Sequence, residues 1–427
     1  MSGERSDGFP LGAAVTLEEL DADPHAVHHR LRPSEPVSWL PCLDGWLVTS
    51  HALASAAMRD PATFTVDDPR FTTARVIGPS MLSLDGAAHD QHRAPFAGPF
   101  RAASVSERFA WSAAERARTL VAELAPRGRA ELRREFAGRM AAATIATALG
   151  MDEAETGEVL AWYDAIVASV SALSAARPDP RAVAGGASAF ATLRERLQPV
   201  ISGTAGDSLL AAAAHAAPQG SDPGANPDGR TPGPHPGSCI GSVRLSDDEI
   251  ASNAAVLLFG GIETTEGMIA NAALEILTHV GEPERIRADP AALDAVIDES
   301  LRREPAAAVV DRYATRELVF GGAPIAAGEL VRISLAGAGR DPAVFPDPDA
   351  YDPTRANLRR HLAFARGPHV CVGVHLARLE ARAALGELLT LPGLRLDPEQ
   401  RPDVRGLVFR KPVALHARWT ARRTASD

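Results

Sequence analysis

The residues with the clearest chemical potential form one stretch, Phe364-Ala365-Arg366-Gly367-Pro368-His369-Val370-Cys371-Val372-Gly373. Cys371 stands where a loop containing Gly and Pro meets a long run of good helix formers. The N–H groups and the positive dipole end at a helix start stabilise a thiolate. Gly367 and Gly373 carry no side chains, so a flat and bulky group can approach the sulfur. Haem iron bound by a cysteine thiolate fits this description, and such a ligand favours O–O cleavage.

Cys371 on its own also allows two other interpretations. A lone cysteine at a helix start is usually a small buried hydrophobic residue. His369, Cys371 and His375 are three residues of the types that bind zinc, although a structural zinc site needs four ligands and no fourth lies nearby.

A second unusual group lies inside a long helix that the sequence predicts from Ser246 to about Val280. Ser246 with Glu249 is a capping box, and the apolar run that follows predicts a buried central helix. Its middle reads Phe259-Gly260-Gly261-Ile262-Glu263-Thr264-Thr265. Each interior glycine costs about 1 kcal/mol relative to alanine. Such local conflicts are expected at functional sites, and the alternative is a kink whose polar residues face a water molecule.

Two further pairs have helical spacing: His89 with Arg93, and Glu299 with Arg302. By themselves they are ordinary solvated faces or chance pairs, since Glu115 and Arg118 repeat the second spacing.

The stretch around Cys371 resembles the haem-binding signature of the cytochrome P450 family, which runs Phe, small residues, Gly, any, His or Arg, any, Cys, any, Gly. Phe364, Gly367, His369, Cys371 and Gly373 match, and Ala365 stands where the family usually has glycine. Five matches in ten residues favour the haem interpretation over the other two. The central helix also resembles the family's, through Gly260, Gly261, Glu263 and Thr264.

The resemblance implies haem b as cofactor, with the Cys371 thiolate as the axial iron ligand. It implies that Glu263 and Thr264 relay protons to dioxygen, which is general acid chemistry. It implies a structural brace for the thiolate loop made of Glu299, Arg302 and Arg355. The remaining cofactor-binding residues that it implies, the propionate ligands among them, are His89, Arg93, Gly261, Arg312, Phe364, Gly367, His369 and Gly373.

The implied activity is that of a haem-thiolate monooxygenase. One oxygen atom of O2 enters a lipophilic small molecule, by hydroxylation or epoxidation, in secondary metabolism. The implied substrate pocket is mainly apolar and is lined by Met81, Val256, Phe259, Ile262, Val309, Val310 and Val408. One alternative is oxidative ring closure or aryl coupling without oxygen incorporation. A non-catalytic haem sensor is another, but it has no use for the glycines and the acid–Thr pair.

The implied fold is mainly α: a single large helical domain over residues 1–427 with small peripheral β-sheets. The chain has 427 residues, 45% of them apolar, which is enough for a large core. Residues 1–20 look loose, and 37–40 with 46–49 form a hairpin. Residues 219–238 are rich in Gly and Pro and are expected to form a disordered insertion.

Charge and composition bear on partners and location. The net charge of −10 argues against nucleic acid, and three cysteines indicate a reducing compartment. The first residues lack a signal-peptide core and no apolar run could span a membrane, so we expect a cytoplasmic monomer. Six arginines against one acid, Glu380, between Arg355 and Arg382 predict a positive face. We expect a ferredoxin-type donor and its reductase to deliver electrons from NAD(P)H there.

Overall fold

The computed structural model of the chain describes residues 2–152, 155–174, 179–203, 208–216, 244–281 and 283–421. These residues form two compact units. Unit 1 comprises Met1–Asp68, Val105–Ile145 and Leu258–Asp427, and unit 2 comprises Pro69–Ser104 and Ala146–Leu257. The predicted insertion, 219–238, lies outside the described residues, and the single-domain organisation stays a prediction.

The N-terminal segment of unit 1 is helical. It forms α1 (Ser2–Gly8), α2 (Pro10–Ala13), α3 (Leu17–Ala22) and α4 (Pro24–Leu31). The expectation that residues 1–20 are loose was therefore wrong. Thr16 and Glu19 form a capping box at the start of α3. The carboxylate of Glu35 accepts hydrogen bonds from the backbone N–H groups of Leu11 and Gly12, at 2.9 and 3.0 Å, which holds α2 in place.

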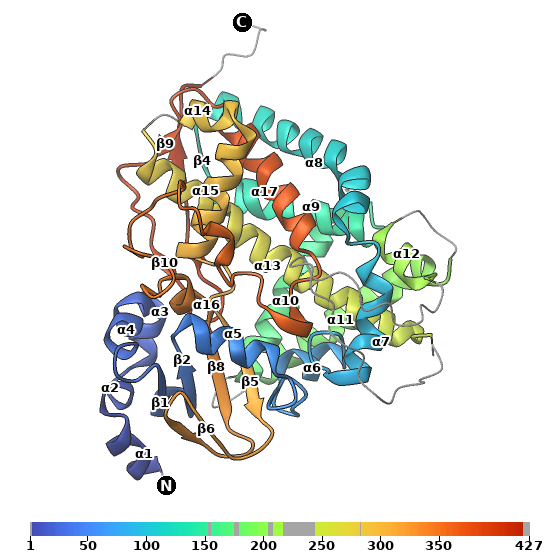
Figure 1. Cartoon of the computed structure of the whole chain (residues 1–427). Helices are drawn as coiled ribbons and strands as arrows, with labels where there is room; N and C mark the ends of the chain where they lie inside the picture. The colour runs from blue at the N-terminus through green and yellow to red at the C-terminus, as the bar shows by residue number, and fades with distance from the viewer. Residues whose placement is uncertain are drawn as a thin grey trace, which may run out of the picture. The chain divides into compact units, whose positions relative to one another are not determined.

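A five-stranded sheet joins strands from the first and last segments of unit 1, in the order β1-β2-β8-β5-β3. The strands are β1 (Val37–Leu40), β2 (Gly45–Val48), β8 (Leu330–Ser334), β5 (Val309–Ala314) and β3 (Phe64–Thr65). The predicted hairpin is confirmed as the antiparallel pair β1–β2. The pair β2–β8 is parallel, and Figure 1 shows β1, β2, β8 and β5 side by side.

Three smaller sheets complete the β-structure described in unit 1. They pair β6 (Leu318–Phe320) with β7 (Ala323–Ile325), β10 (Val404–Arg405) with β11 (Lys411–Pro412), and β12 (His416–Arg418) with both β4 (Arg129–Glu131) and β9 (Arg395–Leu396). The expectation of small β-sheets beside a helical body is confirmed.

The long central helix is α13 (Asp247–His279). The predicted capping box is present: Ser246 Oγ accepts from the Glu249 N–H at 3.3 Å, and the Glu249 carboxylate accepts from the Ser246 N–H at 2.8 Å. Between Ile250 and Ala273 the helix is buried except at Val256, Gly260, Gly261 and Thr264. Three of these are spaced four apart and therefore share one helix face.

Unit 1 contains further helices besides α13. They are α5 (His51–Arg59), α8 (Ala102–Leu124), α14 (Pro283–Ala288), α15 (Pro290–Arg303), α16 (Leu335–Gly339) and α17 (Val374–Leu388), with α9 (Arg139–Ala148) beginning in this unit. One apolar cluster joins α8, α13, α15 and α17 and includes Leu120, Ile276, Val296 and Leu385. A π-helical turn, η3 (Arg133–Gly138), precedes α9.

Unit 2 contains α6 (Thr72–Ile77), α7 (Gly86–Ala97), α10 (Thr156–Ser174), α11 (Pro180–Ile201) and α12 (Leu209–Ala214). Helices α10 and α11 pack closely, because a Cβ on Gly186 would lie only 2.2 Å from Ser169 Cβ. Within the described ranges, no helix is both long and apolar enough to cross a membrane.

Candidate active site

The loop that carries Cys371 is closed by its own backbone. The Cys371 N–H donates to the Phe364 carbonyl oxygen at 2.9 Å, and the Val370 N–H donates to the Gly367 carbonyl oxygen at 3.1 Å. Helix α17 begins three residues after Cys371, with Gly373 as its N-cap. The prediction that Cys371 lies where a loop enters a helix is confirmed. The thiol is therefore near the positive end of a helix, which favours a thiolate.

Two backbone positions in this loop have left-handed conformations. Gly367 has φ +73°, and a Cβ there would lie 2.3 Å from the Met58 carbonyl oxygen of α5. Only glycine can therefore occupy this position without moving α5. Ala365 has φ +58°, a region in which its methyl group costs free energy. Glycine, which the resembling signature usually has at this position, would adopt this conformation at lower cost than alanine.

The surface of this loop has the character of a contact face for a flat apolar group. From Ala363 to Val374 every residue is half-buried, although many of them are apolar. A Cβ added at Gly373 would meet only Cys371 Sγ, at 4.0 Å. The loop therefore leaves open space beside the sulfur, and these residues fit a haem.

The two adjacent glycines of α13, Gly260 and Gly261, have different surroundings. A Cβ on Gly261 would lie 2.9 Å from Ile145 Cδ1, so Gly261 permits close packing between α13 and α9. A Cβ on Gly260 would meet nothing within 4 Å. The open space on this part of α13 therefore lies at Gly260, and the predicted gap beside the cofactor and the contact of Gly261 with it stay predictions.

Glu263 and Thr264 are both held by neighbours. The Thr264 hydroxyl donates to the Gly260 carbonyl oxygen at 2.6 Å, next to the open space. The Glu263 carboxylate lies 2.7 Å from Lys411 Nζ of β11. One turn further along α13, Glu266 Oε1 lies 3.6 Å from the same ammonium group. Sequence reasoning missed Lys411 and Glu266, since neither belongs to a recognised motif.

The three predicted brace residues form one cluster, and their role in bracing the thiolate loop stays a prediction. Arg302 donates from Nε and Nη2 to both carboxylate oxygens of Glu299, at 2.7 and 2.8 Å, and both side chains have 0% exposure. Arg355 Nε donates to Glu299 Oε1 at 3.3 Å. The guanidinium groups also bind backbone carbonyl oxygens of the segment 339–350, which leads toward the Cys371 loop.

The predicted propionate ligands lie in both units. His89 and Arg93 are one turn apart on α7 of unit 2, where His89 is buried. Arg312 lies on β5 of unit 1 and donates to the Asp311 carbonyl oxygen at 2.7 Å. His369 belongs to the turn η6 (Gly367–His369). Their role stays a prediction.

The predicted pocket residues differ in exposure. Val256, Val310 and Val408 are at least partly exposed, whereas Met81, Phe259, Ile262 and Val309 are buried. In unit 1, the Phe259 ring contacts the Phe409 ring edge to face, with centroids 5.5 Å apart. In unit 2, the Met81 N–H donates to Asn253 Oδ1 at 2.8 Å. The pocket as a whole stays a prediction.

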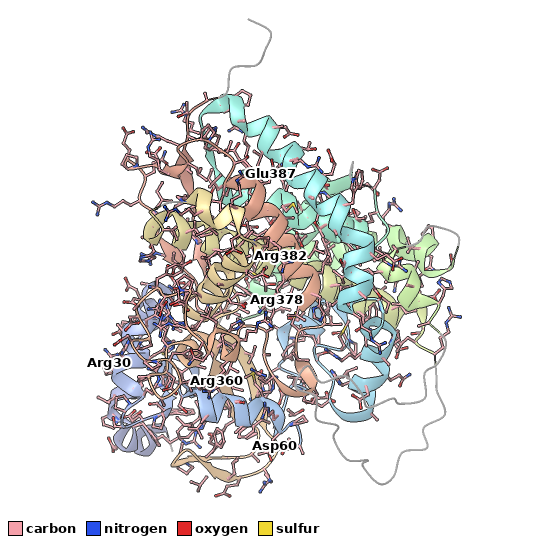
Figure 2. All side chains as sticks on the ribbon, turned by 45° about the horizontal axis from the view of Figure 1, so that its top comes forward. Arg30, Asp60, Arg360, Arg378, Arg382 and Glu387 are labelled. Atoms are coloured by element: carbon pink, nitrogen blue, oxygen red, sulfur yellow. The ribbon has the colours of Figure 1, made fainter. Side chains whose placement is uncertain are left out.

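The arginine-rich stretch is less positive than its sequence predicts. Arg378 lies 2.6 Å from Asp298, and Arg382 makes two hydrogen bonds of 2.7 Å to Asp294, so two acids of α15 neutralise two arginines of α17. Burial alone would raise the pKa of Asp298, but His361 and Arg378 outweigh it and lower the pKa. Figure 2 shows Arg378, Arg382 and Glu387 following one another along α17. The count of one acid was therefore misleading, because acids of α15 lie against the stretch.

The zinc interpretation finds no support. Within the described part of the chain, no three His, Cys, Asp or Glu side chains come together as a metal site.

Comparison with solved structures identifies the fold. The chain resembles the crystal structure of CalO2 with a TM-score of 0.80 over 95% of this chain and 99% of that one, at 23% identity. It also resembles P450BioI, solved with hexadec-9Z-enoic acid ligated acyl carrier protein, with a TM-score of 0.79 over 94% and 100% of the two chains, at 24% identity.

Sequence comparison gives the same answer. The family model "Cytochrome P450" matches residues 240–407. Cytochrome P450 monooxygenase PikC of Streptomyces venezuelae is 32% identical, over 96% of this chain and 94% of PikC. The 6-deoxyerythronolide B hydroxylase of Saccharopolyspora erythraea is 29% identical, over 94% of this chain and 97% of that protein.

Fold and relatives together define an oxidoreductase that uses haem-thiolate iron. The chain belongs to the cytochrome P450 family, and it is a monooxygenase. Members of this family take electrons from redox partners and bind lipophilic substrates. The relatives are named for oxygen insertion, which favours monooxygenation over the ring-closure alternative.

Proposed function

We propose that this protein binds haem b through the thiolate of Cys371 and hydroxylates or epoxidises a lipophilic secondary metabolite. The observation that carries the proposal is the half-buried loop 363–374, where a Cβ on Gly373 would meet only the sulfur of Cys371, at 4.0 Å. Phe364, Gly367, His369 and Gly373 would surround the ligand, and His89, Arg93, Arg312 and His369 would hold the propionates.

The haem, when bound, supplies the activation of dioxygen. The residues of α13 would manage protons. The Thr264 hydroxyl, held on the Gly260 carbonyl oxygen, stands beside the open space and would hand on a proton there. Glu263, an acid one residue away with a cation 2.7 Å from it, would resupply that hydroxyl. Thr265 is 3% exposed and is turned about 100° further round the helix, so it would take no part.

The substrate class rests on the relatives and on the apolar residues near α13. Relatives are named for 20-oxo-5-O-mycaminosyltylactone and for vitamin D(3), both handled by monooxygenases or hydroxylases. In this chain the paired rings of Phe259 and Phe409 present an apolar surface one residue from Gly260. We infer a bulky, largely apolar substrate.

We also infer an acidic, ferredoxin-type electron donor. Arg359 is 86% exposed and lies 4.0 Å from Asp298, and Arg360 is exposed beside it. Arg378 and Arg382 are in much closer ion pairs, 2.6 Å from Asp298 and 2.7 Å from Asp294. The electrostatic attraction for an acidic donor would therefore come mainly from the arginines of the turn η5 (Leu358–Arg360) rather than from those of α17.

The ligand assignment is tested by spectroscopy. The purified protein should contain haem, and its reduced carbon monoxide complex should show the strongly red-shifted Soret band of a thiolate ligand. Cys371→His should lose this band. Cys42→Ser is the matched control, because Cys42 is the other described cysteine and lies in the turn η1 (Pro41–Leu43). An unchanged spectrum in Cys371→His would contradict the assignment.

The proton role is tested by coupling. With a compound selected by spectral binding from a panel of macrolides and steroids, Thr264→Ala should consume NAD(P)H but release mainly hydrogen peroxide. Glu263→Gln should slow the whole cycle, and Thr265→Ala should behave nearly as the wild type. Undiminished product per NAD(P)H in Thr264→Ala would rule out this hydroxyl as the essential donor.

A further inference from the structure

Lys411 is the only lysine in the sequence, whereas arginine occurs many times. A lone lysine on the surface would mean little. This one is 12% exposed and lies against two acids of the central helix, at 2.7 Å from Glu263 and 3.6 Å from Glu266.

The surroundings of Lys411 and Glu266 are shaped to bring them together. A Cβ on Gly267 would lie 2.8 Å from Ala306 Cβ and 3.6 Å from Lys411 Cβ, so this glycine lets β11 approach α13. A Cβ on Gly138, at the end of the π-helical turn η3, would lie 3.3 Å from Glu266 Oε2. The carboxylate of Glu266 thus occupies space that Gly138 leaves, and Gly267 leaves room for Ala306 and Lys411.

Glu266 is fully buried at 0% exposure, and its two carboxylate oxygens differ. Arg134 Nη1 donates a long hydrogen bond to Oε2 at 3.5 Å, whereas Arg133 lies 3.4 Å from Oε1 without a hydrogen bond to it. Across the part of the chain that the structure describes, Oε1 has no hydrogen-bond partner. A buried oxygen without a donor is costly for a carboxylate and cheaper for a carboxylic acid.

Burial raises the pKa of Glu266, and the nearby Glu263 raises it further, while Lys411, Arg134 and Arg133 oppose the rise. The protonated form of Glu266 therefore persists at higher pH than in an exposed glutamate. The charged groups that face Glu266 are therefore Glu263 of α13, Lys411 of β11, and Arg133 and Arg134 of η3.

The choice of lysine matters for proton transfer. A guanidinium group does not give up its proton in proteins, whereas a lysine ammonium can do so when it is buried. An arginine at position 411 could form the ion pair with Glu263 but could not hand a proton on.

We propose that Lys411 passes protons from Glu266 to Glu263. The ammonium group gives one proton to the Glu263 carboxylate and takes one from the carboxylic acid of Glu266, so Lys411 ends as it began. Glu266 is then reprotonated from water where Arg134, 45% exposed, reaches it. This inference rests on the proposed role of Glu263 and adds the source from which that acid is refilled.

The first test uses the single lysine as a label. In protein grown with ¹⁵N-lysine, the ferrous carbon monoxide form should give one ¹⁵Nζ signal, which needs no assignment. Its chemical shift should change as Glu266 ionises. This change should occur at a pH above 4.5, the usual pKa of a glutamate, and Glu266→Gln should abolish it. A signal that titrates identically in Glu266→Gln would show that Lys411 does not sense the ionisation of Glu266, and it would overturn the proposed relay.

The second test measures turnover with the compound selected above. Lys411→Arg and Glu266→Gln should each lower product formation about tenfold or more and raise the solvent isotope effect, since a positioned proton-transfer group is lost. Arg303→Lys is the matched control. Arg303 of α15 is 11% exposed and lies 3.0 Å from Glu275, which is an acid of α13 like Glu263 and Glu266. This control variant should leave turnover unchanged.

The outcomes separate the two proposals. If Glu263→Gln lowers coupling but Lys411→Arg and Glu266→Gln do not, Lys411 only positions Glu263 and the relay is overturned. If Glu263→Gln leaves coupling unchanged, the proposed proton role of Glu263 fails first. If Lys411→Arg does not fold, Glu266→Gln alone decides, because it retains both Lys411 and Glu263.

Discussion

Replacing Arg302 by methionine would remove the cation from the most deeply buried ion pair of the described chain while keeping most of the side-chain volume. Arg302 makes two bonds to Glu299 and donates to the carbonyl oxygens of Gly339, Pro348 and Ala350 at 2.7, 2.8 and 3.1 Å. In the variant, Glu299 would keep Arg355 Nε at 3.3 Å and the Asp352 N–H at 2.8 Å as donors. Its charge would stay buried with much weaker compensation.

Removing one partner of a buried ion pair costs about 3–5 kcal/mol. The entropy of unfolding is about 2.1 cal/mol/K per residue, or about 0.9 kcal/mol/K for a chain of 427 residues. The thermal midpoint of Arg302→Met should therefore fall by about 3–6 °C.

The chain offers a matched control in Arg382→Met. Arg382 makes the same two-bond contact with Asp294, both bonds at 2.7 Å, but the two side chains are 51% and 34% exposed. Exposed pairs contribute about 0–1 kcal/mol, so this midpoint should fall by no more than about 1 °C. Scanning calorimetry of both holoproteins, with the haem content measured beside it, makes the comparison.

Equal falls in the two variants would refute the reasoning from burial. A further variant, Glu299→Gln with Arg302→Met, should recover part of the loss, because it removes the stranded charge. If the double variant were less stable than Arg302→Met, the buried charge would not be the cause.

Three other changes have defined outcomes. Ala365→Gly should raise the thermal midpoint by about 1 °C, because the left-handed conformation costs alanine about 1–2 kcal/mol and the freedom of glycine in the unfolded chain returns about 0.4–1 kcal/mol; a lower midpoint would show that the turn is unstrained. Arg359→Glu should slow reduction by an acidic ferredoxin more at low than at high salt in stopped-flow traces, and a salt-independent effect would indicate structural damage instead. Burial alone would raise the pKa of Glu304, but His25 and Arg410 hold it down to about 2, so its stabilising contribution is complete above pH 4.5 and is lost as the pH falls toward 2. Glu304→Gln should flatten urea-unfolding stability across that range, and an unaltered acid limb would count against the pair.

The parts of the structure that the sequence predicted well depend on local signals. The capping box of Ser246 and Glu249 marks the start of α13, and Gly and Pro mark the loop before Cys371. The hairpin β1–β2 follows from short apolar runs around a turn. In each case the residues that decide the conformation are close together in the chain.

The errors and omissions have a common physical cause, since they involve partners from distant segments. The N-terminal helix α2 is held by Glu35, which sequence patterns do not connect to it. The arginines of α17 are neutralised by Asp294 and Asp298 of α15. Lys411 is a partial exception, because a single lysine among so many arginines is visible in the composition itself.

The parallel pairing of β2 with β8 has a consequence for how the protein is made. Val48 pairs with Ile333, so the ribosome must add about 285 residues between the two strands. At 5–20 residues per second this takes about 15–60 s. During that time one edge of β2, the one not paired with β1, is open and can join a strand of another nascent chain. Cys371 emerges later still, so haem can be captured only after this sheet has become able to close.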